Sequence, residues 1–198
     1  MFEIYEKGLK VSMRKILVAG LFSAVTLFAG NYTVDKSHSG VAFKVKHMMI
    51  SNVKGSFDQF DGKFEYDEKA NTLKSLDGVI EVASVNTANA KRDGHLKSAD
   101  FFDAANHPLI TFKLTKVDGD EAYGELTMRG VTKKIELDFE AGGTGKNPWG
   151  KTVAGFSLSG KIKRSDFGLK WNKALEAGGM LVGDTIKLEI DVEGVKAN

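Results

Sequence analysis

The sequence predicts an all-β protein, an antiparallel β-barrel of about eight strands with one short helix. Apolar residues alternate with polar or charged ones along residues 41–46, 131–140 and 186–193, which gives each segment two different faces, as in a β-strand. The 22 glycines, against two prolines, suit the bends and corners of a barrel. A closed barrel is favoured over a two-sheet sandwich, the alternative, because closure removes unpaired strand edges.

The other elements follow from weaker alternation and from turn-forming clusters. Turns are expected at residues 67–71, 118–120, 129–130 and 141–150. Residues 89–98 indicate a short helix, and residues 172–183 form an irregular stretch with room for a helical turn. With no repeat or low-complexity linker, residues 31–198 are expected to form one domain. The weaker strands are expected at residues 53–66, 73–86, 109–118, 122–129 and 152–163.

Residues 1–30 are expected to lie outside the barrel, as an N-terminal extension and signal peptide. Arg14 and Lys15 precede an uncharged apolar run over residues 16–28, and Ala29 and Gly30 supply small residues after it. This order of basic, apolar and small residues is typical of a secretory signal. The apolar run is shorter than the about 20 residues of a membrane span. The segment therefore predicts cleavage near Ala29 or Gly30 and export to the periplasm or beyond, with an uncleaved anchor as the alternative.

Charge and cysteine content exclude several classes of function. The first 30 residues hold four of the 28 basic and two of the 26 acidic residues, so the remaining chain carries 24 of each. A neutral chain has no overall electrostatic attraction to nucleic acid or to an anionic membrane. The chain has no cysteine, which excludes disulfides, thiol nucleophiles and cysteine metal sites.

Phenylalanine is abundant on the predicted strand faces. Ten of the 13 phenylalanines lie between residues 43 and 167, and several have glycine or alanine close by in the sequence. A barrel of about eight strands either fills itself with side chains or holds one small ligand. Alternation with a period of two does not distinguish these cases, so a hollow and a solid barrel both remain open from the residues alone.

Sequence motifs for covalent chemistry find little structural context. Residues 145–152 match the phosphate-loop pattern G-x-x-x-x-G-K-T, but residues 153–160 after them alternate as a strand, where that loop requires a helix. Residues 155–159 lack the final glycine of a serine-hydrolase elbow. The four histidines show none of the spacings that zinc sites use. No catalytic residue, metal or cofactor is therefore predicted.

Arg92, Asp93 and His95 form the densest polar cluster. Two interpretations remain open for it. The cluster contacts a ligand head group at the mouth of the barrel, or Asp93 complements the helix dipole while Arg92 pairs with a carboxylate.

The order of several short motifs resembles the YceI-like family over nearly the whole chain after residue 30. The resemblance implies an extended, lipocalin-like barrel with a short helix and a long apolar cavity for a polyisoprenoid, an isoprenoid quinone or a fatty acid derivative. It also allows a homodimer. The matching segments are residues 32–39, 84–87, 92–96, 100–103, 124–127, 130–132, 164–168 and 182–184, with Phe43, Val45, His47, Gly55, Phe57, Phe60, Gly62, Pro108 and Phe112 between them.

The predicted function is a periplasmic carrier of an amphiphilic lipid, with no nucleic acid partner and no stable membrane insertion after cleavage. There are two alternatives: a lipid-directed hydrolase that uses Arg92, Asp93 and His95, and a stress-response interaction protein with a solid barrel.

The predicted site residues form two sets, one at the mouth of the barrel and one in the cavity wall. The head group or mouth is assigned to His47, Arg92, His95 and Arg164. The apolar lining is assigned to Phe43, Val45, Phe57, Phe60, Phe101, Phe102, Phe112, Leu126, Phe156 and Phe167.

Overall fold

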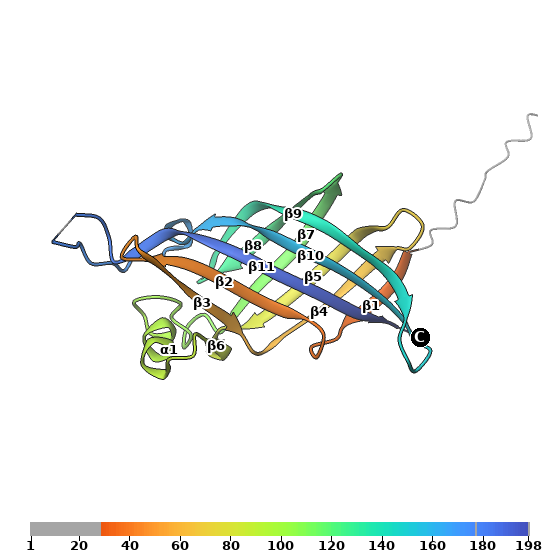
Figure 1. The fold of residues 1–198 in the computed structure, drawn as a ribbon, viewed down its shortest axis with the longest axis horizontal. Helices are drawn as coiled ribbons and strands as arrows, with labels where there is room; N and C mark the ends of the chain where they lie inside the picture. Colours follow the sequence, from red (N-terminus) through yellow and green to blue (C-terminus); the bar gives the residue numbers. More distant parts are fainter. Residues whose placement is uncertain (1–28, 177, 198) are drawn as a thin grey trace, which may run out of the picture.

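A long barrel of antiparallel strands, with a short helix beside one end, forms the body of the protein (Figure 1). The computed structural model describes residues 29–176 and 178–197, so the predicted export signal lies almost entirely outside the described residues. The elements are β1 (Ala29–Val34), β2 (Gly40–His47), β3 (Ser51–Phe57), β4 (Phe60–Asp67), β5 (Thr72–Glu81), η1 (Val82–Ser84), β6 (Val85–Asn86), α1 (Ala90–Lys97), β7 (Leu109–Asp118), β8 (Glu121–Met128), β9 (Val131–Lys146), β10 (Thr152–Lys163), η2 (Arg164–Phe167) and β11 (Val182–Lys196).

Eight strands close the barrel, as predicted. The hydrogen-bonded order β1-β4-β5-β7-β8-β9-β10-β11 returns to β1, because β1 pairs with both β4 and β11. Tyr32 makes both junctions, opposite Phe64 on β4 and Lys196 on β11. Strands β2, β3 and β6 extend the sheet from the same edge of β11 that β1 uses, because β10 occupies the opposite edge while β1 pairs with residues 194–196 and β2 with residues 182 and 186–191. The closed ring excludes the two-sheet sandwich.

The predicted elements match closely where alternation is regular and differ where glycine or a turn intervenes. Strands β7 and β10 have the predicted bounds, and α1 lies within the predicted helix, capped by the Asn89 side chain, which accepts from the Arg92 backbone N–H at 3.0 Å. Four predictions were wrong. Residues 73–86 form β5, η1 and β6 in place of one strand, and β6 pairs with β3 whereas β5 pairs with β4 and β7. Residues 53–66 form two strands, because the chain bends at Asp58 between β3 and β4. The loop expected at 141–150 is strand as far as Lys146, because this glycine-rich run pairs with β10.

The fourth wrong prediction concerns the irregular stretch 172–183. Its described part holds no helix, and Ala174 and Met180 instead form an isolated antiparallel bridge. Among the described residues, no helix combines the length and the apolar character needed to cross a bilayer.

The barrel end near the described termini is filled by aromatic side chains. The rings of Tyr32 and Phe64 stack at 5.1 Å with an interplanar angle of 7°, and Phe156 meets Phe64 edge-on at 5.1 Å. Tyr66 is fully buried beside them. A second apolar cluster, which includes Phe57, surrounds the other half of the interior. Because one end is densely packed, an internal cavity has room only in the other half of the barrel.

Gly194→Ala is expected to lower the free energy of unfolding by about 1–3 kcal/mol, because the site has no room for a methyl group. A Cβ there would collide with the Phe64 ring and come within 3.1 Å of the Thr33 carbonyl oxygen. Urea unfolding followed by circular dichroism measures the loss. Gly40→Ala is the matched control, since a Cβ at Gly40 meets nothing within 4 Å. Equal stability of the two variants would contradict this account of the packed end.

Candidate functional site

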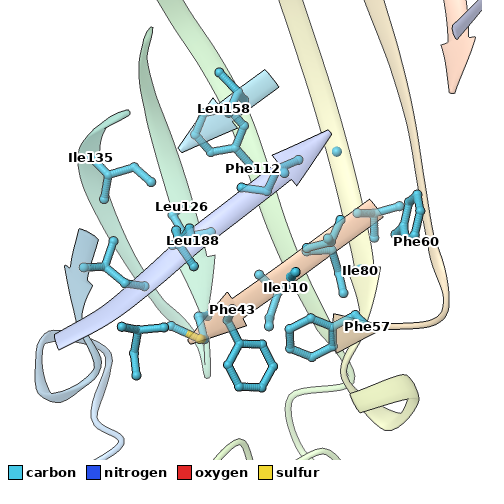
Figure 2. A pocket seen from close by; sticks show the side chains of 18 of the residues that line it. Phe43, Phe57, Phe60, Ile80, Ile110, Phe112, Leu126, Ile135, Leu158 and Leu188 are labelled. Atoms are coloured by element: carbon cyan, nitrogen blue, oxygen red, sulfur yellow. The ribbon is translucent and has the colours of Figure 1, made fainter. Parts of the chain in front are cut away.

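We call the packed rings of Tyr32, Phe64, Tyr66 and Phe156 the aromatic plug. An apolar cavity of about 190 Å³ lies inside the barrel next to this plug. Its wall is almost entirely carbon, and Figure 2 shows aromatic and aliphatic side chains from many strands around one space. An apolar cavity of about 150 Å³ is known to stay dry and to bind small apolar molecules. The wall includes Phe43, Phe57, Phe60, Ile80, Ile110, Phe112, Leu126, Ile135, Leu158 and Leu188.

Small residues on the strands keep this space open. A Cβ at Gly124 would collide with the Phe112 ring, and a Cβ at Gly55 would collide with the Phe43 ring. Both rings therefore lie flat against the sheet, where a side chain on the neighbouring strand would otherwise push them across the barrel. Gly78 also belongs to the wall, and a Cβ there would have no atom nearer than 4.0 Å. The glycines explain how a phenylalanine-rich barrel remains hollow.

Helix α1 and the loop after it cover one end of the cavity. Leu96, Phe101 and Phe102 belong to its wall, and Phe102 meets Phe57 edge-on at 5.8 Å. Arg129 fixes this cover, because its guanidinium donates to the Ala99 carbonyl at 2.8 Å and to the Gly168 carbonyl at 2.5 Å. The loops that carry Ala99 and Gly168 are thereby held to one another.

Arg164 is a buried cation at the same end, with 5% of its surface exposed. Its guanidinium donates to the carbonyls of Gly183 at 3.0 Å, Leu169 at 2.5 Å, Trp171 at 3.0 Å and Val182 at 3.4 Å. Burial lowers the pKa of Arg164, and the charge of nearby Asp184 acts against that shift. No carboxylate of the described residues forms an ion pair with it. Arg164 thus ties two loop segments together and presents one of three charged residues in the cavity wall, with Asp61 and Asp191.

The cavity wall contains many of the residues that the sequence singled out, although ligand contact itself stays a prediction. They are Phe43, Val45, Phe57, Phe60, Phe101, Phe102, Phe112, Leu126 and Arg164.

Phe156 and Phe167 do not line the cavity, which corrects their assignment. Phe156 packs into the aromatic plug between Phe64 and Phe139, with ring centroids at 5.1 and 6.2 Å. Phe167 is 1% exposed, within the apolar cluster around η2. Strand alternation identifies the inward face but not the height along the barrel axis.

Arg92 and His95, the predicted mouth residues on α1, bind neighbouring protein groups and lie outside the cavity wall. Arg92 donates from Nε to the Thr87 hydroxyl at 2.7 Å and from Nη2 to the Thr87 carbonyl at 2.8 Å, and Asp93 accepts from the Thr87 backbone N–H at 2.9 Å. His95 Nε2 pairs with Asp100 at 2.8 Å. Neither Arg92 nor His95 is in the cavity wall. Arg92 and Asp93 therefore fix the start of α1 and do not converge with His95 on a common point.

His47, the remaining predicted mouth residue, ends β2 outside the cavity wall. It lies opposite Val182 of β11, whose side chain does belong to the wall. His47 is therefore adjacent to the cavity without lining it.

The aliphatic half of the wall was missing from the predicted set. Ile186, Leu188 and Ile190 of β11 all line the cavity, and their alternation with charged residues is regular. That alternation is the signal that identifies them. The prediction concentrated on phenylalanine and so left out most of the aliphatic side chains.

A separate polar cluster joins the β1–β2 turn to β11, away from the cavity wall. His38 Nδ1 lies 3.0 Å from Asp35 and 3.9 Å from Glu193. Hydrogen bonds from Ser37 and His38 lower the pKa of Asp35 to about 2, and the bond to Asp35 raises the pKa of His38. The imidazole is mostly exposed, so we assign the cluster to holding the turn in place.

A closed antiparallel barrel around an apolar cavity defines the class of small-ligand-binding β-barrels, to which lipocalins belong. Within that class, the chain belongs to the YceI-like family, because the family model of the YceI-like domain matches residues 32–194. UPF0312 protein SA2479 of Staphylococcus aureus strain N315 is 42% identical over 165 residues, which cover 82% of this chain and 96% of that protein.

Solved structures share the fold. The crystal structure of a Campylobacter jejuni YceI protein is 41% identical, with a TM-score of 0.64 over 83% of this chain and 96% of that one. A polyisoprenoid-binding domain from Saccharophagus degradans has a TM-score of 0.61 at 17% identity, over 84% of this chain and 98% of that one. At that identity the second likeness concerns the fold alone.

Proposed function

We propose that the protein is a periplasmic carrier that holds a long-chain apolar ligand in its barrel and performs no covalent chemistry. The ligand is a polyisoprenoid, an isoprenoid quinone or a fatty acid derivative. The observation that carries the proposal is the almost wholly apolar wall of the cavity inside the barrel. Membership of the YceI-like family supports it, and a structural neighbour is described as polyisoprenoid-binding.

The physical chemistry of the wall suits such a ligand. Burying one CH₂ group gains about 0.8 kcal/mol, so a chain that buries about ten gains on the order of 8 kcal/mol before the free energy of ordering and association is subtracted. Binding therefore needs a continuous apolar wall more than a charged clamp. The few charged groups in the wall leave most of its length free for an alkyl or prenyl tail.

Three observations support carriage over the alternatives. The basic, apolar and small residues of the first 30 positions support export to the periplasm. Arg92 and Asp93 bind Thr87 while His95 binds Asp100, which speaks against a hydrolase built on these three side chains. The cavity speaks against a solid barrel.

Protein purified from its own host is expected to carry a long-chain lipid. Native mass spectrometry measures it as an added mass that organic extraction removes, and the stripped protein is expected to take up an apolar fluorescent dye. Protein with neither lipid nor dye uptake would overturn the proposal. Turnover of a lipid ester that His95→Ala abolishes would favour the hydrolase instead.

A further inference from the structure

Charged side chains on one side of the barrel alternate in sign from strand to strand. Lys63 of β4 lies opposite Asp77 of β5, which in turn lies opposite Lys113 of β7. The row continues through Glu125 of β8 to Lys134 of β9. Opposite charges at directly paired positions stabilise a sheet, so this row needs no other explanation.

A second row, on the other side, breaks that pattern. Lys161 of β10 lies opposite Lys187 of β11, Lys187 lies opposite Lys44 of β2, and Lys44 lies opposite Lys54 of β3. We call these four residues the lysine row. Neighbouring strands are about 4.8 Å apart, so the four Cα atoms span only about 15 Å. Their flanking residues Phe43, Ile186 and Ile162 line the cavity, which places the lysines on the outer face.

The lysine row is poorly compensated by acidic groups. Like charges at paired positions destabilise a sheet. Lys44 pairs with Glu189 at 3.1 Å, whereas Lys54, Lys161 and Lys187 form no ion pair within the described part of the chain. At the β9 end of the row, Lys161 and Lys187 share a shallow surface depression with Glu136, Asp138 and Glu189, so the lysines on β2 and β3 are the less compensated half. The row is therefore positive chiefly on its β2–β3 side, although residues 31–198 carry equal numbers of basic and acidic residues.

An apolar tip ends the β2–β3 hairpin, which supplies two of the four lysines. Met48, Met49 and Ile50 are 41%, 63% and 80% exposed, and Met180 beside them is 50% exposed. Met48 and Met49 both have positive φ, at 51° and 61°, a conformation that such residues rarely adopt. The tip touches the loop before β11, because the Met48 backbone N–H donates to the Leu181 carbonyl at 2.8 Å.

Figure 1 shows the β2–β3 hairpin, the loop before β11 and helix α1 at the same end of the barrel. Exposed Lys46 is on β2 between the row and the tip, and no carboxylate occurs anywhere in β2, the turn or β3. Asp184 is the first acidic residue of β11 after the loop that the tip touches. Its carboxylate already accepts from the Ser165 backbone N–H at 3.1 Å and from the Ser165 hydroxyl at 2.8 Å. Val45 and Val182, next to the tip, belong to the cavity wall.

We propose that the lysine row and the apolar tip form a docking surface for a bilayer that contains anionic phospholipids. Lysines attract an anionic surface within about 8 Å at physiological salt, and exposed apolar side chains then enter the boundary between head groups and acyl chains. Nucleic acid would use the lysines and leave the apolar tip without a role, so the bilayer is the better partner. The location of the tip beside the cavity gives docking a purpose, namely ligand exchange with the membrane, and this clause alone rests on the proposed function.

Vesicle flotation with the purified full chain tests the surface. Wild-type protein is expected to float with phosphatidylcholine vesicles that contain 30% phosphatidylglycerol, to bind pure phosphatidylcholine at least tenfold more weakly, and to be released by high salt. The double variant Ile50→Asp/Lys54→Glu is expected to lose at least tenfold in binding. The matched control is Trp149→Asp/Lys151→Glu, which makes the same chemical changes in an exposed turn at the other end of the barrel, where Trp149 is 78% exposed.

The outcomes separate the docking surface from the cavity. Retained dye uptake by the Ile50→Asp/Lys54→Glu variant, together with lost flotation, supports docking and shows that the barrel is folded. Wild-type protein that fails to float, or an equal loss in the control variant, overturns the proposal. So does normal flotation of Ile50→Asp alone, which would indicate a general polyanion site. Failure of dye uptake in wild-type protein would overturn the proposed function while leaving the flotation result to decide docking.

Discussion

Gly78→Phe is expected to weaken binding of a long-chain apolar ligand about a hundredfold while leaving the barrel folded. Gly78 belongs to the cavity wall, and a Cβ there would have 4.0 Å of clearance to the nearest atom, the Phe112 carbonyl oxygen. A phenylalanine would therefore project into the cavity. Excluding about four CH₂ groups of a ligand removes about 3 kcal/mol of transfer free energy, which is roughly a hundredfold in Kd.

Fluorescence titration of stripped protein with an apolar dye or a fluorescent fatty acid measures this loss. Gly40→Phe is the matched control, because Gly40 also has free space at its Cβ position but is not in the cavity wall. Both variants are expected to fold, because phenylalanine suits a strand better than glycine does, and thermal unfolding checks this. An unchanged Kd in Gly78→Phe would mean that the ligand binds elsewhere.

Local pattern was sufficient to predict the strands, because alternation is a property of a single segment. Residues 109–118 and 152–163 show this, since β7 and β10 have those bounds. The closure of the barrel depends on Tyr32, which pairs with strands 32 and 164 residues further along the chain. No local signal in β1 specifies those partners, so the closed ring followed from the number of strands and the avoidance of edges.

The cavity was less predictable than the barrel, because it depends on which residues lie at the same height along the axis. Phe112 and Phe156 both point inward from long strands, yet Phe112 lines the cavity and Phe156 fills the plug. Gly124 decides the orientation of the Phe112 ring from the neighbouring strand. The lysine row has the same character, since each lysine is an ordinary outward residue until the strand register aligns it with the next.

Arg164→Met is expected to lower the free energy of unfolding by about 3 kcal/mol and to speed ligand release. Methionine keeps much of the side-chain volume but donates no hydrogen bond, so the carbonyls of Leu169, Trp171 and Gly183 lose the guanidinium donor, whereas the Val182 carbonyl keeps the Asn172 amide at 2.8 Å. An unsatisfied buried polar group costs about 1–3 kcal/mol. Removal of a buried charge that lacks a carboxylate partner offsets part of this loss. The net loss remains large because one guanidinium serves four acceptors.

Urea unfolding and dye dissociation rates measure the two effects of Arg164→Met. Lys163→Met is the matched control, because it removes the neighbouring, exposed cation, whereas Arg164 is 5% exposed. Arg164→Lys is expected to fall between wild type and Arg164→Met, since one ammonium group reaches only some of the carbonyls that the planar guanidinium spans. If Arg164→Met matched the wild type in both stability and dissociation rate, the loops at the cavity end would be held by their apolar contacts, Leu169 among them, and the buried cation would have another role.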